Sequence, residues 1–155
     1  MIRLIRSAAA FALCAFIVIN LSCAPSVKTG ADVLVDGHLG LLYGNKRVGV
    51  ICNHTTRFAD GTLLVDSLIG LGVRVKMLFG PEHGIRGGAG AGEEVDNGLD
   101  PVTKVPVVSL YGKIDRPTDE MMKQIDILVF DIQDVGARFY TYATTMALAM
   151  EAAGR

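Results

Sequence analysis

The chain has 155 residues, half of them hydrophobic, and its formal charge at pH 7 is −1. This length and this apolar content suit one globular domain with a core of its own. Nothing in the near-neutral charge suggests the concentrated basic face with which proteins bind nucleic acid, so we expect no nucleic-acid partner.

The N-terminal residues have the order of an export signal. Arg3 and Arg6 precede an unbroken apolar run over residues 8–19, and small or polar residues follow it. The run is shorter than the ~20 apolar residues that a membrane-spanning helix needs. We therefore interpret residues 1–22 as a signal peptide. The alternative is a membrane anchor that stays on the protein.

Cys23 extends this prediction to a lipid anchor. Residues 21–23 (Leu-Ser-Cys) resemble the lipobox of bacterial lipoproteins, in which the cysteine is acylated and becomes the new N-terminus, although Asn20 and Leu21 depart from the usual pattern. Plain cleavage after Ala24 is the competing interpretation. We expect acylation of Cys23, a tether over residues 23–30, and an exported protein of the cell envelope that is anchored in the membrane and faces the periplasm or the exterior.

After the tether, apolar runs of strand length alternate with segments of helical periodicity. Residues 62–71, 118–125 and 142–153 predict helices, the second with Thr118 as its N-cap. In the last helix, we expect Tyr142, Met146, Ala149, Met150 and Ala153 to share one face. The strands are predicted over residues 47–52, 73–79, 105–110 and 127–132.

Strands that are apolar on both faces and alternate with helices indicate a mainly parallel sheet covered by helices on both sides. The predicted fold class is therefore α/β and Rossmann-like, over residues 31–155. Residue 155 follows a helix at the point where such a fold enters its next strand, which leaves a four-stranded sheet with an uncovered edge. We therefore expect residues 31–155 to be the N-terminal part of a catalytic domain that is incomplete at its C-terminus.

Polar residues follow each predicted strand. Ligands of open α/β sheets bind beyond the carboxyl ends of the strands, so these side chains are expected to converge on one rim. The first strand runs into Asn53 and the second into Glu82, after a Gly-Pro pair that stops it. The complete set of rim candidates is Asn53, His54, Glu82, His83, Arg86, Tyr111, Asp131, Gln133, Asp134, Arg138, Tyr140 and Tyr142.

Glu82 is the strongest candidate for acid or base chemistry, because partial burial beside a strand end tunes a carboxyl group for proton transfer. It could equally be a structural clamp held by Arg86 or by a backbone amide. His83 could orient Glu82, bind substrate or cap the turn. We group Glu82, His83 and Asp131 as catalytic candidates and the other rim residues as substrate-binding ones.

The remaining rim residues leave alternatives open. Asp131 and Asp134 could supply a second carboxyl group, but Asp131 could also cap the next loop and Asp134 could pair with Arg138. Tyr140 and Tyr142 could stack on a sugar, donate hydrogen bonds or simply pack. The long glycine-rich, acidic stretch over residues 84–104 is irregular, and loops of that length in compact domains are usually functional or mobile.

Four segments of the chain resemble the exo-β-N-acetylmuramidases, glycoside hydrolases of peptidoglycan recycling that were long catalogued as a domain of unknown function. They cover residues 49–55, 78–87, 109–112 and 131–142, and their order and spacing agree with that family over about residues 31–155. His54 stands where glutamine is commoner. Members of the family are longer than this chain and carry a smaller C-terminal domain.

The resemblance implies an exo-acting enzyme that releases terminal N-acetylmuramic acid from peptidoglycan fragments (muropeptides) without a metal or nucleotide cofactor. It implies that Glu82 is the catalytic acid. With such a substrate, Arg86 or Arg138 could bind the lactyl carboxylate of the sugar through a bidentate contact. By itself, the chain could be inactive. A non-catalytic muropeptide-binding lipoprotein is the alternative function. A metal-dependent hydrolase is the other, although His54, His83, Asp131 and Asp134 lack compact metal-ligand spacing.

Overall fold

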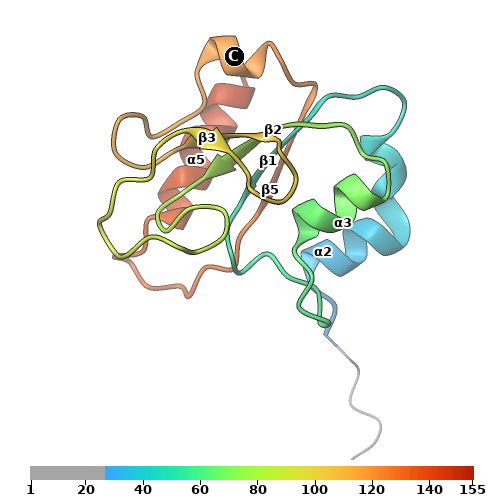
Figure 1. The fold of residues 1–155 in the computed structure, drawn as a ribbon, viewed down its shortest axis with the longest axis horizontal. Coiled ribbons are helices and arrows are strands. Elements are labelled where there is room, and N and C mark those ends of the chain that lie inside the picture. The colour runs from blue at the N-terminus through green and yellow to red at the C-terminus, as the bar shows by residue number, and fades with distance from the viewer. Residues whose placement is uncertain (1–26) are drawn as a thin grey trace, which may run out of the picture.

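A computed structural model of the protein describes residues 27–155, so the predicted signal peptide and Cys23 lie outside the described residues. Figure 1 shows a central sheet with helices on either side. Within the described range the sheet has five strands in the order β3-β4-β2-β1-β5. They are β1 (Val48–Cys52), β2 (Val75–Gly80), β3 (Gly98–Leu99), β4 (Pro106–Ser109) and β5 (Ile127–Asp131).

The four strands predicted from the sequence are present and pair in parallel, which confirms the α/β fold class. The fifth strand, β3, was not predicted, because it has two residues, both exposed, and no apolar alternation. It pairs antiparallel with β4 through Gly98 and Val107 and covers that edge of the sheet. The predicted four-stranded sheet is therefore wrong in strand number, and β5 is the strand at the opposite edge within the described residues.

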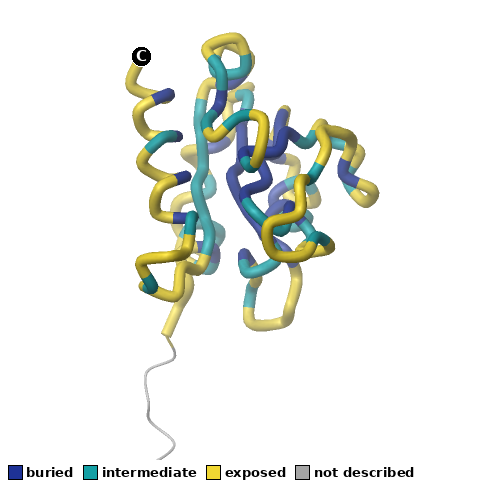
Figure 2. The backbone as a smooth tube through the Cα atoms, turned by 90° about the vertical axis from the view of Figure 1, so that its left-hand side faces the viewer, coloured by how far each residue is buried: buried dark blue, intermediate teal, exposed yellow. Residues whose placement is uncertain are grey.

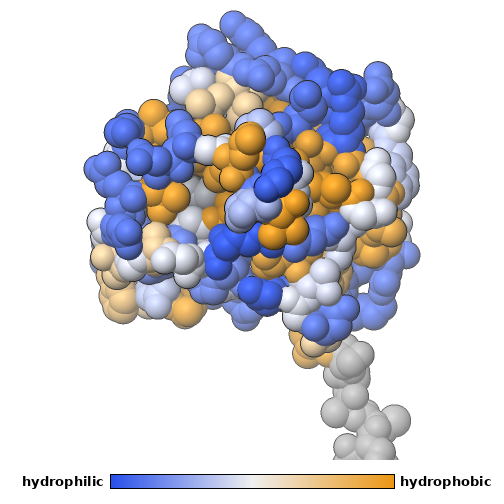
Figure 3. Space-filling model, viewed as in Figure 1, coloured by the Kyte–Doolittle hydropathy of each residue, from blue (hydrophilic) through white to orange (hydrophobic). Residues whose placement is uncertain are grey.

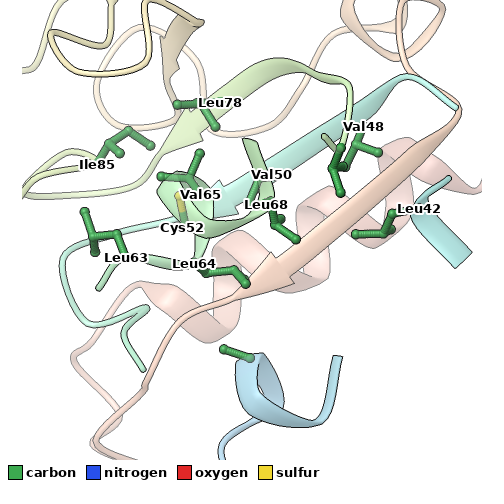
Figure 4. Packing of buried hydrophobic residues seen from close by; sticks show 12 residues of the cluster. Leu42, Val48, Val50, Cys52, Leu63, Leu64, Val65, Leu68, Leu78 and Ile85 are labelled. Carbon is green, nitrogen blue, oxygen red and sulfur yellow. The ribbon is translucent and has the colours of Figure 1, made fainter. Parts of the chain in front are cut away.

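Side-chain alternation along β1 explains why helices cover both faces of the sheet. Val48, Val50 and Cys52 belong to one apolar cluster, whereas Ile51 belongs to another on the opposite face. Figure 4 shows the first cluster, in which β1 packs against Leu64 and Leu68 of α3 (Leu64–Gly70). Burial of both faces makes β1 the centre of the fold, and all five of its residues are buried.

The first cluster also includes a helical segment that the sequence analysis did not predict. It runs through α2 (Gly30–Val33), η1 (Leu34–His38) and η2 (Leu39–Leu42), and it buries Ala31 and Leu42. Thr29, in the predicted tether, caps it: its hydroxyl accepts from Asp32 N at 3.2 Å, and its own N donates to the Asp32 carboxylate at 2.9 Å. Changes of helix type and two internal glycines hid this segment from periodicity.

The opposite face of the sheet is covered by α4 (Asp119–Met122) and α5 (Tyr142–Ala153). Thr118 caps α4 as predicted, but the helix ends at Met122 and does not reach residue 125. Figure 2 shows that buried positions of α5 face the sheet while its outer side is exposed. No helix among residues 27–155 combines the length and the apolar character that crossing a membrane requires.

The predicted inner face of α5 is partly wrong. Its buried residues are Tyr142, Thr145, Ala149 and Ala152, whereas Met146 and Met150 are 41% and 67% exposed. Apart from Tyr142, the buried side chains are small, whereas the two methionines lie on the exposed side of the helix.

Candidate active site at the carboxyl edge of the sheet

The carboxyl ends of the four parallel strands meet at one edge of the sheet. Cys52 of β1 pairs with Asp131 of β5, and Gly80 of β2 pairs with Ser109 of β4. Each strand therefore stops at nearly the same level, and the chain leaves it into the loops that carry the predicted site residues. The predicted rim is thus present as a set of neighbouring loops.

Glu82 lies where two of these loops meet. One oxygen of its half-buried carboxyl group, Oε1, accepts a hydrogen bond from Gly92 N at 3.0 Å. The other, Oε2, accepts from Thr141 Oγ1, just before α5, at 3.3 Å. Gly92 belongs to the long loop over residues 84–104. Both partners are neutral donors, so the carboxyl group is oriented without being neutralised by a fixed cation.

Tyr142 is the first residue of α5 and directly follows Thr141, which contacts Glu82. It is 5% exposed, and burial raises the pKa of its hydroxyl. The Asn53 amide opposes this rise, whereas the negative charges of Glu82 and Asp134 and the hydroxyl of Tyr140 add to it. The Tyr142 ring also packs against the Tyr140 ring, with the centroids 5.9 Å apart. The Tyr142 hydroxyl, like that of an ordinary tyrosine, is protonated at neutral pH and can donate a hydrogen bond.

Asn53 ties the ends of β1 and β5 together. It is fully buried, and its Oδ1 accepts from Thr55 N at 2.8 Å and from Thr55 Oγ1 at 2.6 Å. Thr55 Oγ1 in turn accepts from Gln133 N at 3.0 Å, while the Thr56 hydroxyl donates to the Asp131 carbonyl. Asn53 Nδ2 has no hydrogen-bond partner among the described residues. The hydrogen bond to Thr55 fixes the backbone of Gln133, although Gln133 is an exposed residue.

His54 and His83 pack against each other beside a tight turn. His83 has a positive φ of 72°, and its Nδ1 lies 3.0 Å from the Ala89 carbonyl oxygen. Of the three roles considered for His83, this contact matches capping of the turn. The His54 ring stands edge-on to His83, with the centroids 6.4 Å apart. Gly87 is required here, because its φ is +73° and a Cβ would lie 2.6 Å from His54 Cγ.

Arg86 is held by two carboxylates and does not face Glu82. Its guanidinium makes two hydrogen bonds to Asp66, both of 2.8 Å, and two to Asp100, of 2.9 and 2.7 Å. Asp100 has a side chain only 1% exposed and also accepts from Thr103 N. We call Arg86, Asp66 and Asp100 the arginine clamp. It fastens the loop after β2 to α3 and to the end of β3, which argues against the predicted role of Arg86 in substrate binding.

The clamp holds Asp100 ionised. Its hydrogen bonds from Arg86 lower the pKa of the Asp100 carboxyl group well below the usual range; burial opposes this effect and Thr103 assists it. Because the folded-state pKa is lowered, the stabilisation is present above the unfolded-state pKa of ~3.9 and is lost as pH falls below it.

Asp131 does not join Glu82. The side chains of β5 alternate, with Val129 in the α3-side cluster and Phe130 in the α5-side cluster. Asp131 shares the parity of Val129 and lines a pocket of 290 Å³ together with Thr29 and Thr56. Burial raises the pKa of its carboxyl group there. The structure therefore gives no support to the prediction of Asp131 as a second catalytic carboxyl beside Glu82.

Two further predicted site residues, Tyr111 and Asp134, make no hydrogen bond with Glu82 within the described part of the chain. Tyr111 lines a different pocket, of 490 Å³, at the end of β4. Asp134 accepts from Gly136 N at 2.6 Å, and among the described residues it makes no ion pair with Arg138, the pairing that the sequence left open as one alternative. Within residues 27–155, no three His, Cys, Asp or Glu side chains lie close enough together to hold a metal ion.

Four residues of this region were missed by sequence reasoning. Thr141 was detectable, since a threonine directly before a predicted helix is a common N-terminal residue. Gly92 acts through its backbone, and a side-chain pattern carries no signal for that. Asp66 and Asp100 are acids on a helix and in a loop, and nothing in their local sequence points to Arg86.

Comparison with known proteins identifies relatives of this region. The family model described as exo-β-N-acetylmuramidase NamZ, N-terminal, matches residues 48–155. Over 130 residues the chain is 52% identical to the peptidoglycan β-N-acetylmuramidase NamZ of Bacillus subtilis (strain 168). This match covers 83% of this chain and 31% of that protein.

Two crystal structures of DUF1343 family proteins from Bacteroides fragilis NCTC 9343 share the fold. One has a TM-score of 0.72 and 46% identity, covering 81% of this chain and 31% of the other. The second has a TM-score of 0.63 and 37% identity, covering 79% of this chain and 30% of the other. The chain therefore spans about a third of the length of the relatives it matches.

Proposed function

Because this chain belongs to the family of exo-β-N-acetylmuramidase NamZ N-terminal domains, we propose that it carries the catalytic acid of a glycoside hydrolase that acts on peptidoglycan. The observation that carries the proposal is the setting of Glu82. Its carboxyl group lies at the carboxyl edge of the sheet, oriented by Gly92 N and Thr141 Oγ1. It has two neutral donors and remains free to transfer a proton.

In the proposed reaction, Glu82 protonates the oxygen of a terminal N-acetylmuramic acid glycoside as the bond from that oxygen to the anomeric carbon breaks. Glycosidases complete this chemistry with a second carboxyl group or with the substrate's own 2-acetamido group, which N-acetylmuramic acid carries. Asp131 lines a pocket with Thr29 and Thr56 and makes no hydrogen bond with Glu82 in the described part of the chain, which favours the acetamido route. Water finally adds to the anomeric carbon and returns a proton to Glu82.

The test is hydrolysis of a chromogenic N-acetylmuramide by the protein expressed from its whole reading frame, with the Bacillus subtilis relative as a positive control. We expect release of the chromophore and of free N-acetylmuramic acid in equal amounts. Tight binding of muropeptides without turnover would instead indicate a binding lipoprotein, and loss of turnover with a chelator would indicate a metal-dependent hydrolase.

We also propose that the protein is exported and anchored in the cell envelope through acylated Cys23, on the evidence of the signal-like order of residues 1–22. Metabolic labelling with a fatty acid during bacterial expression is expected to label the wild type. Cys23→Ala should abolish the label. Cys52→Ala is the matched control, because Cys52 is buried and burial raises its pKa to about 12, so it should leave the label unchanged. Label retained in Cys23→Ala would refute the anchor.

A further inference from the structure

The segment between β5 and α5 carries a charged residue and two aromatic residues directly before Thr141, which contacts the candidate acid. Tyr140 N donates to the Ala137 carbonyl at 3.0 Å, which closes a turn over residues 137–140. Thr141, the next residue, donates to Glu82. Arg138, Phe139 and Tyr140 therefore occupy the turn that leads directly into a contact with the carboxyl group.

Phe139 and Tyr140 form an exposed aromatic surface on this turn. Phe139 is 84% exposed and Tyr140 39%, and their ring centroids are 5.4 Å apart. Tyr140 also packs against the buried ring of Tyr142, with the ring centroids 5.9 Å apart. The surface over this segment, at the lower left of Figure 3, includes apolar residues. The three rings thus form a row from the buried Tyr142 to the exposed Phe139. Exposed aromatic rings of this kind can stack on the apolar face of a pyranose.

Arg138 supplies the charge that such a surface lacks. Of the two arginines considered for carboxylate binding, Arg86 has two edges of its guanidinium hydrogen-bonded in the arginine clamp, one to Asp66 and one to Asp100. Arg138 is exposed, and the described residues offer it no hydrogen bond or ion pair, since Asp134 is turned toward Gly136. An arginine whose guanidinium is unoccupied can bind a carboxylate through two parallel hydrogen bonds.

We propose that Arg138, with Phe139 and Tyr140, forms the subsite that recognises a pyranose bearing a carboxylate, and that it selects N-acetylmuramic acid over N-acetylglucosamine. The two sugars differ in the lactyl ether, whose carboxylate binds Arg138 while the rings contact the sugar face. The assignment rests on the proposed function, because it takes the substrate class from there. It makes Arg138 the specificity-determining residue of the site.

The experiment compares chromogenic N-acetylmuramide and N-acetylglucosaminide with the protein expressed from its whole reading frame. Arg138→Gln should lower kcat/KM for the muramide by roughly ten- to a hundred-fold, the worth of a charged hydrogen-bonded pair, and leave the glucosaminide unaffected. Arg138→Lys should recover part of the loss. Phe139→Ala should weaken both substrates. Arg74→Gln is the matched control. Arg74 contacts Asn45 at the amino ends of the strands, away from the site, so this variant should change neither rate.

A second measurement separates this inference from the proposed function. Free N-acetylmuramic acid and N-acetylglucosamine are titrated against isotope-labelled wild type and Arg138→Gln, with binding followed by NMR. A preference for N-acetylmuramic acid that disappears in Arg138→Gln supports the subsite even where the wild type shows no turnover, which would contradict the proposed function alone. An unchanged preference in Arg138→Gln, or no preference in the wild type, would overturn the role of Arg138.

Discussion

Replacement of Glu82 by glutamine is expected to lower kcat for an N-acetylmuramide by about 10²–10⁴-fold, the usual contribution of a positioned acid. Glutamine keeps the shape of the side chain and an oxygen that can accept from Gly92 N, so KM and the melting temperature should stay close to wild type. Steady-state kinetics with the protein expressed from its whole reading frame measures both constants.

Thr141→Val is the matched comparison for this variant. It removes the 3.3 Å contact to Glu82 but leaves the carboxyl group in place, so kcat should fall much less than in Glu82→Gln. Wild-type turnover by Glu82→Gln would show that Glu82 is not the acid, and equal losses in the two variants would assign Glu82 a structural role.

Replacement of Arg86 by glutamine is expected to reduce the free energy of unfolding by about 3–5 kcal/mol, the typical effect of removing one partner of a buried ion pair. The reason is that Asp100, with a side chain 1% exposed, would remain as a buried charge without its cation. Urea unfolding followed by circular dichroism measures the change. Such a loss is a large share of the stability of an ordinary domain.

A second arginine–aspartate pair provides the control for the arginine clamp. The Arg47 guanidinium makes two hydrogen bonds to Asp126, but about a third of each side chain is exposed. Arg47→Gln should therefore cost clearly less than Arg86→Gln. Wild-type stability should also fall as pH drops below ~4, where the paired carboxylates take up protons. Arg86→Gln should lose less over that range. Equal stability of Arg86→Gln and the wild type would refute the clamp.

Much of the fold was predictable because apolar runs report burial directly. The runs around Val50, Leu78 and Val129 predicted three strands of the sheet, since each supplies side chains to both covered faces. The same logic fails for β3, which has no buried side chain. It fails in part for α5, where the buried residues are small and the large apolar residues Met146 and Met150 lie outside.

The sequence by itself determined the fold class, the family resemblance and the candidate acid, because these depend on local patterns: apolar runs that stop at Gly-Pro and a Glu that follows. Only the tertiary structure decided between the two arginines. Asp66 and Asp100 stand 20 and 14 residues from Arg86 in the chain. Side chains so far apart in sequence meet only when α3 and the loop after β3 pack against the sheet. The tertiary structure also leaves Arg138 without an ion pair among the described residues, three positions before Thr141, which contacts Glu82.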